Sequence, residues 1–137
     1  MAVLCGGAIF LNKLKWRGRF ERLKQYDSAL AADSQFYKEI RKSEKKEFPI
    51  LEIEKILKLY ILRQYRVPIF ELSNQQTILL IKKKYPRIKN ERRYIFNLFK
   101  DIEALKGNSD FNQRKKIIEH CYRFIDLTEN LKQQGVL

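Results

Sequence analysis

The segment NERRYIFNLFKDIEALK, residues 90–106, decides the fold of this chain. Its apolar side chains recur every three to four residues, which is the period of an α-helix that buries one face. The Gly107-Asn108 pair that follows supplies the left-handed backbone conformation at which helices commonly end. The sequence therefore predicts an amphipathic helix over residues 90–106. Its apolar face consists of Tyr94, Ile95, Leu98, Phe99, Ile102 and Leu105.

Two helices are predicted upstream, separated by a polar link at residues 42–47. The second covers residues 50–66 and follows Pro49, because proline fits the first turn of a helix, where its missing N–H costs nothing. Val67-Pro68 ends it, since a residue before proline avoids the α region. Its apolar stripe is Ile53, Ile56, Leu57, Tyr60 and Ile61. The first covers residues 28–42, with Leu30, Phe36, Tyr37 and Ile40 as its apolar residues.

Capping residues mark two more helices. Ser73 is a predicted N-cap with Gln76 at the capping-box position, and its helix carries Ile78, Leu79 and Ile81 before Tyr85-Pro86 ends it. Asp110 or Ser109 caps the last helix. The apolar face of that last helix is Ile117, Ile118, Cys121, Ile125 and Leu131.

These segments together predict the fold class. No segment alternates between apolar and polar residues for long enough to indicate a strand. We therefore predict an all-α fold, a single compact bundle of about five to six helices. Residues 26–137 are the predicted bundle domain, and residues 1–25 are an apolar-then-basic N-terminal segment.

Composition narrows the class of protein further. The 137 residues carry 29 Lys and Arg against 16 Asp and Glu, a formal net charge of +13. Cys5 and Cys121 are too few for a disulfide scaffold. No run approaches the roughly 20 apolar residues of a spanning helix, which excludes a multi-pass membrane protein. The 45% of hydrophobic residues argue against intrinsic disorder.

The N-terminal segment has two interpretations. Residues 1–11 are apolar, and basic residues follow them, as at the cytoplasmic end of a membrane-spanning helix. In the first interpretation the chain begins inside such a helix. In the second, residues 1–25 form an amphipathic first helix that packs Ile9, Phe10, Leu14, Trp16, Phe20 and Leu23 on its own domain. The basic residues of this segment are Lys13, Lys15, Arg17, Arg19 and Arg22.

Catalytic and metal-binding patterns are absent from the sequence. His120 and Cys121 are neighbours on a predicted helix and point about 100° apart, so they do not chelate a metal or form a nucleophile pair. Cys121 lies on the apolar face, which favours a buried, inert thiol. Glycines are too scarce for a phosphate-binding loop. We therefore expect no enzyme activity, no metal and no cofactor.

Basic charge is the remaining functional signal. It permits three interpretations: nucleic-acid binding, contact with an anionic membrane or a protein partner, or a solvated face with no specific role. The interleaved aromatics would serve base stacking, but Tyr94, Phe96 and Phe99 are predicted to face the core or lie near it. The densest cluster is Lys82, Lys83, Lys84, Arg87, Lys89, Arg92 and Arg93, and a second is Arg114, Lys115 and Lys116.

The order of motifs resembles a known family. The motifs are FYKEI (36–40), LKLYILRQYRVP (57–68), ELS (71–73), NLFKDIEALK (97–106), IIE (117–119) and FIDLTE (124–129). They resemble the helical cytoplasmic domain of small membrane proteins in the Bat (aerotolerance) gene clusters, which also encode a MoxR-type AAA+ ATPase and von Willebrand A-domain proteins. The chain departs from that family in lacking a whole membrane helix, and in carrying Glu103-Ala104-Leu105-Lys106 where a phenylalanine-alanine is usual.

The resemblance implies a non-enzymatic accessory protein on the cytoplasmic side of the bacterial inner membrane. Its implied partners are a von Willebrand A-domain protein or the MoxR-type ATPase. The leading hypothesis is thus a membrane-proximal protein-interaction domain. The alternative is a basic helical nucleic-acid-binding module.

Overall fold

The computed structural model describes residues 2–107 and 110–137, with side chains from Asn12 onward. No strand occurs in this described part of the chain, so the all-α prediction is confirmed. Two short 3-10 helices, η1 (Arg22–Tyr26) and η2 (Ile69–Glu71), join longer elements. The described α-helices are α1 (Ala2–Glu21), α2 (Ala32–Glu44), α3 (Ile50–Tyr65), α4 (Asn74–Lys84), α5 (Lys89–Leu105) and α6 (Phe111–Gln133).

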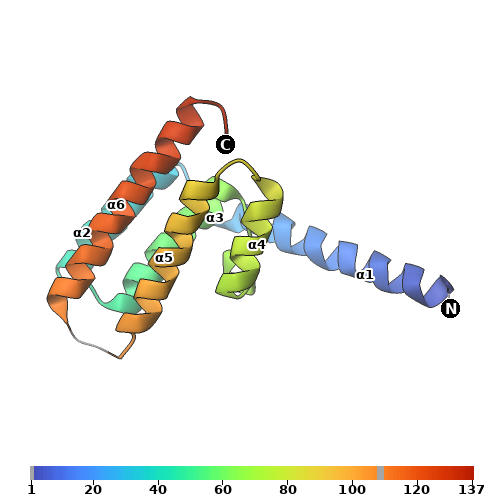
Figure 1. Cartoon of the computed structure of the whole chain (residues 1–137), viewed down its shortest axis with the longest axis horizontal. Coiled ribbons are helices and arrows are strands. Elements are labelled where there is room, and N and C mark those ends of the chain that lie inside the picture. The colour runs from blue at the N-terminus through green and yellow to red at the C-terminus, as the bar shows by residue number, and fades with distance from the viewer. Residues whose placement is uncertain (1, 108–109) are drawn as a thin grey trace.

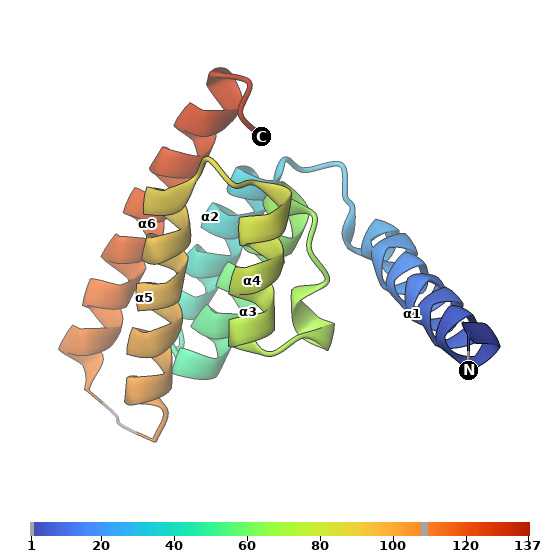
Figure 2. The ribbon, with the colours of Figure 1, turned by 45° about the vertical axis from the view of Figure 1, so that its right-hand side comes forward.

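Helices α2 to α6 form the bundle. The consecutive pairs α2–α3 and α5–α6 pack as helical hairpins, and α3 also contacts both α5 and α6. Helix α4 packs on α5 (Figures 1 and 2). Helix α1 projects away from the bundle, and its N-terminal end is the point of the molecule farthest from α6 (Figure 1).

The core is rich in stacked aromatic rings. Phe124 of α6 is fully buried and stacks on Tyr65 and Tyr94, with centroids 6.0 Å and 6.3 Å away. Tyr60 meets the same ring edge-on at 6.1 Å. Such pairs contribute beyond simple burial, about 0.5–1.5 kcal/mol each. These contacts join α3, α5 and α6 around one ring.

Buried tyrosine hydroxyls find partners on α6. The Tyr65 hydroxyl shares a 2.8 Å hydrogen bond with Thr128 Oγ1, and both residues are fully buried. The Tyr60 hydroxyl donates to Glu129 Oε1 at 3.2 Å. Burial is the main cause that raises the pKa of both tyrosines, so they stay neutral at physiological pH.

The predicted helix ends agree closely with the structure where local signals set them. Ser73 and Gln76 form the predicted capping box: Gln76 N donates to Ser73 Oγ at 3.1 Å, and Ser73 N donates to Gln76 Oε1 at 3.0 Å. Asp110 caps α6 by accepting from two backbone amides. Gly107 has a φ of +85°, as predicted after α5. Asn108 and Ser109 lie outside the described residues.

The predicted start of α2 is wrong. The helix begins at Ala32 rather than at residue 28. The Leu30 carbonyl accepts a hydrogen bond from Arg63 Nη2 of α3 at 2.7 Å, and Ser28 Oγ donates to the same carbonyl at 3.2 Å. That carbonyl is therefore used outside a helix, and the Leu30 side chain is 44% exposed instead of buried. Pro49 is the N-cap of α3 rather than a residue of its first turn.

Candidate functional site

Helix α1 is attached to the bundle through η1. Leu23 of η1 is buried, and Tyr26 packs on Phe70 with ring centroids 5.6 Å apart. Arg22 forms an ion pair with Glu71, which follows α3 in the chain. These contacts fix the C-terminal end of α1, while the rest of α1 extends from the bundle (Figure 2).

The second interpretation of the N-terminal segment is correct only in part. Leu23 is buried and Phe20 packs against the core as predicted, but Leu14 is 47% exposed. Trp16 is half-buried. Ile9 and Phe10 lie outside the residues whose side chains are described. Of the predicted packing residues with described side chains, only Phe20 and Leu23 contact the core, so the contact lies at the C-terminal end of α1 and in η1.

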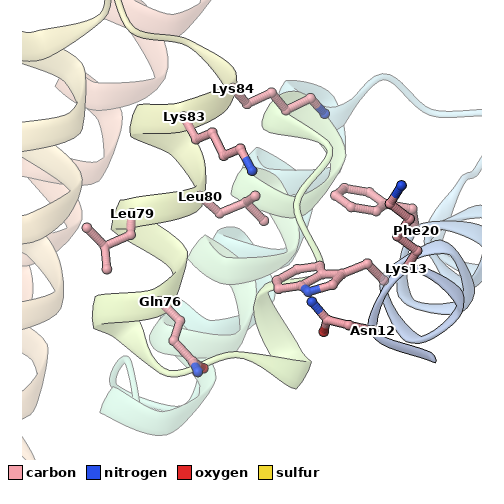
Figure 3. A pocket seen from close by; sticks show the side chains of 9 residues that line it. Asn12, Lys13, Phe20, Gln76, Leu79, Leu80, Lys83 and Lys84 are labelled. Atoms are coloured by element: carbon pink, nitrogen blue, oxygen red, sulfur yellow. The ribbon is translucent and has the colours of Figure 1, made fainter. Parts of the chain in front are cut away.

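A groove of about 850 Å³ lies between α1 and α4. Its apolar lining comes from Trp16 and Phe20 on α1 and from Leu79 and Leu80 on α4. Figure 3 shows Leu80 on the wall of α4 that faces α1, with the Lys83 ammonium reaching over the same space. The remaining described lining residues are Asn12, Lys13, Gln76, Lys83 and Lys84, so no acidic side chain lines this groove among the residues whose side chains are described.

Lys84, the last residue of α4, lies at one end of the groove and holds two parts of the fold together. Its ammonium donates to the carbonyls of Tyr65 and Arg66 at 3.2 Å and 2.9 Å, where α3 ends. Arg66 has a φ of 53°, so the chain turns sharply there. Lys84 Nζ also lies 5.7 Å from the centre of the Phe20 ring. Desolvation and the nearby Arg66 lower the pKa of Lys84.

The other predicted basic residues of α1 and η1 fall into two groups. Lys13 and Lys15 are exposed and make no ion pair within the described part of the chain. The remaining three already have partners. Arg17 pairs with Glu21 at 3.1 Å, Arg19 lies 4.8 Å over the Trp16 ring, and Arg22 pairs with Glu71.

The basic cluster around the turn from α4 to α5 is mostly exposed. Arg92 is the exception, because it is half-buried and its Nη1 atom is buried without a hydrogen-bond partner in the described structure. None of the others forms an ion pair with a described residue. Besides Lys84, the exposed members are Lys82, Lys83, Arg87, Lys89 and Arg93.

The aromatic residues of α5 do not form a stacking surface together. Phe99 is buried and Tyr94 stacks on Phe124, as predicted. The prediction for Phe96 is wrong, because its side chain is 53% exposed. Phe96 instead lines a second groove of about 500 Å³ between α4 and α5, together with Ile78 and Leu79.

The sequence already held a signal for these two grooves. Ile78-Leu79-Leu80-Ile81 places four apolar residues in succession, and successive helical residues are about 100° apart, so they surround the helix. Only Ile81 is fully buried, and Leu79 is 57% exposed. Because the central turn of α4 is apolar on every side but buried on only one, it leaves apolar surface for another contact.

His120 and Cys121 do not come together as a reactive pair. Burial raises the pKa of the Cys121 thiol to about 12, so it is not a nucleophile near neutral pH. His120 instead packs edge-on against Tyr94 at 6.4 Å. No group of three or more His, Cys, Asp or Glu residues suited to a metal occurs among the described residues.

Comparisons with family models, with curated proteins and with solved structures find no match to this chain. Within residues 2–107 and 110–137, no helix combines the length and apolar character required to cross a membrane. The described surface features that bear on function include the two grooves beside α4 and the exposed basic residues of α1, α4 and α5.

Proposed function

We propose that this chain is a non-catalytic, membrane-proximal protein-interaction domain. One observation carries the proposal: α1 projects from the bundle and places the uncharged residues 2–12 directly before exposed basic residues (Figure 1). A projecting helix with an apolar end and flanking Lys and Arg is suited to lie on an anionic lipid surface. The bundle and its grooves would then be held beside that surface, free to bind a protein.

The resemblance to the Bat cluster proteins suggests where this takes place and with which partners. It favours the cytoplasmic side of the bacterial inner membrane. It also favours a von Willebrand A-domain protein or a MoxR-type ATPase as the partner. A basic domain of net charge +13 suits that side of the membrane, because Lys and Arg collect on the cytoplasmic side.

Vesicle flotation of the full chain tests the proposal. We expect binding to vesicles of phosphatidylglycerol and phosphatidylcholine, and no binding to vesicles of phosphatidylcholine alone. The double variant Lys15→Ala/Arg17→Ala should bind more weakly by about 2 kcal/mol, roughly 30-fold, since each basic residue near the surface contributes about 1 kcal/mol. The matched control is Lys115→Ala/Lys116→Ala, which removes the same charge from exposed sites at the start of α6.

Two outcomes would overturn the membrane proposal. One is equal weakening by both double variants, which would indicate a response to net charge rather than to α1. The other is failure to bind either vesicle combined with steeply salt-dependent binding to duplex DNA, weakened by Lys89→Ala/Arg93→Ala. That second result would favour the nucleic-acid alternative.

A further inference from the structure

We infer that the groove between α1 and α4 binds an acidic amphipathic helix of a protein partner. The inference rests on the proposed interaction role and names the chemistry of the partner. Three properties of the groove support it: its shape, its charge and its apolar lining.

The shape of the groove fits a helix of about two turns. Lining residues run from position 12 to 20 on α1 and from position 76 to 84 on α4. Eight residue steps of helix correspond to about 12 Å on each wall. Apolar anchors at positions i, i+3 or i+4 and i+7 of a partner helix span a similar length. A groove of about 850 Å³ accommodates such a set of side chains.

The charge of the groove selects an acidic partner. Lys13 and Lys83 are exposed at its rim and have no ion pair with a described residue, and the described lining residues include no carboxylate. Charge complementarity steers a partner to such a rim and excludes basic partners. A second copy of this chain is disfavoured for the same reason, because each copy carries a net charge of +13.

The apolar lining favours a helix over a lipid chain. Trp16, Phe20, Leu79 and Leu80 line a groove that stays open along one side. An alkyl chain in an open groove would leave much of its apolar surface in water, and that exposed surface would contribute no hydrophobic free energy to binding. An amphipathic helix covers the same apolar residues and turns its own polar face to the solvent.

Trp16 provides a direct signal for occupancy, since it is the only tryptophan in the chain and lines the groove. The probe is a synthetic amphipathic helical peptide with leucines at i, i+3 and i+7 and glutamates beside them. We expect its titration to shift Trp16 emission to shorter wavelength and to saturate. Two control peptides, one with lysines in place of the glutamates and one with the leucine order scrambled, should leave the emission unchanged.

Four variants separate the groove from general charge and apolar effects. Leu80→Glu and Lys83→Glu should each weaken peptide binding by about tenfold or more, because they alter the apolar residue of α4 that faces α1 and a rim charge (Figure 3). Lys55→Glu makes the same charge change at an exposed site on α3 and should have little effect. Phe96→Glu alters the second groove alone and should also leave binding intact.

The failures of the two proposals are distinguishable. Equal weakening by Lys83→Glu and Lys55→Glu, or by Leu80→Glu and Phe96→Glu, would overturn the groove inference. A Trp16 shift caused by phosphatidylglycerol vesicles but not by the peptide would also overturn it, and would leave the membrane proposal standing. Peptide binding with the expected variant pattern, in a chain that fails to bind vesicles, would support the groove and remove the membrane role.

Discussion

Helices α4 and α6 are both rich in apolar residues, yet they use them differently. Helix α6 buries residues along its central half, from Ile117 to Thr128, against α5 and α3. Helix α4 buries only Thr77 and Ile81 and has one main neighbour, α5. The difference teaches that apolar content alone does not define a core. Apolar side chains that a helix leaves exposed, such as Leu79 of α4, provide surface to which a partner can bind.

The ends of α4 compensate for its light packing. At the N-terminus the side chains of Ser73 and Gln76 form a capping box, in which each accepts a hydrogen bond from the backbone N–H of the other residue. At the C-terminus Lys84 and the Tyr85 hydroxyl both donate to the Tyr65 carbonyl, which ties α4 to the end of α3. Helix α4 is thus positioned by polar contacts at its two ends, and its middle is free to border both grooves.

The largest loss of stability is expected from Phe124→Ala, which alters the core. Phe124 is fully buried and touches three aromatic rings, so its removal leaves a large cavity. We expect a loss of about 3–5 kcal/mol in the free energy of unfolding, measured by urea denaturation with far-UV circular dichroism. The matched control is Phe96→Ala, where the ring is 53% exposed and the loss should stay within about 0.5 kcal/mol.

A comparable loss in both phenylalanine variants would contradict the distinction between the buried face of α6, which carries Phe124, and the exposed side of α5, which carries Phe96. Phe96 would then have to be covered in solution. Sedimentation of the wild-type chain would show whether self-association covers it.

Much of the fold was predictable because local chemistry sets most helix ends. The predicted helix over residues 90–106 is observed as Lys89–Leu105, and the predicted Ser73 cap and Gly107 stop are in place. The start of α2 was not predictable, because a side chain 33 positions away, Arg63, takes the Leu30 carbonyl. Tertiary hydrogen bonds of this kind leave no local pattern in the sequence.

The site was less predictable than the fold. The basic residues were identified, but sequence could not show that Lys84 closes the end of α3 or that Arg22 pairs with Glu71. Both contacts join elements that are distant in the chain. The prediction for Phe96 was wrong for a related reason. Helical periodicity places Phe96 beside the apolar face of α5, and only the position of α4 decides whether its side chain is covered.

An intermediate effect is expected inside the core from the buried hydroxyl pair. Tyr65→Phe leaves Thr128 Oγ1 buried without its 2.8 Å partner, so we expect a loss of about 1–3 kcal/mol in unfolding free energy. Thr128→Val should cost a similar amount, since it leaves the tyrosine hydroxyl unsatisfied. The double variant should be less destabilised than the sum of the two, because it removes both polar groups together. Simple additivity in urea denaturation would show that the two hydroxyls do not depend on each other.

The smallest effect is expected from Ser73→Ala, and it tests whether α4 opens on its own. Loss of the Ser73 Oγ cap should cost about 1 kcal/mol. Because α4 has one main neighbour, we expect that cost to appear as roughly fivefold faster hydrogen exchange at the amides of α4, with the amides of α6 less affected. Ser34→Ala is the control, since Ser34 is exposed in α2 and its hydroxyl caps no helix, so its effect should lie within about 0.5 kcal/mol. Equal acceleration in α4 and α6 would mean that α4 unfolds only with the whole bundle. The walls of both grooves would then be as rigid as the core, and a partner helix would bind a preformed surface.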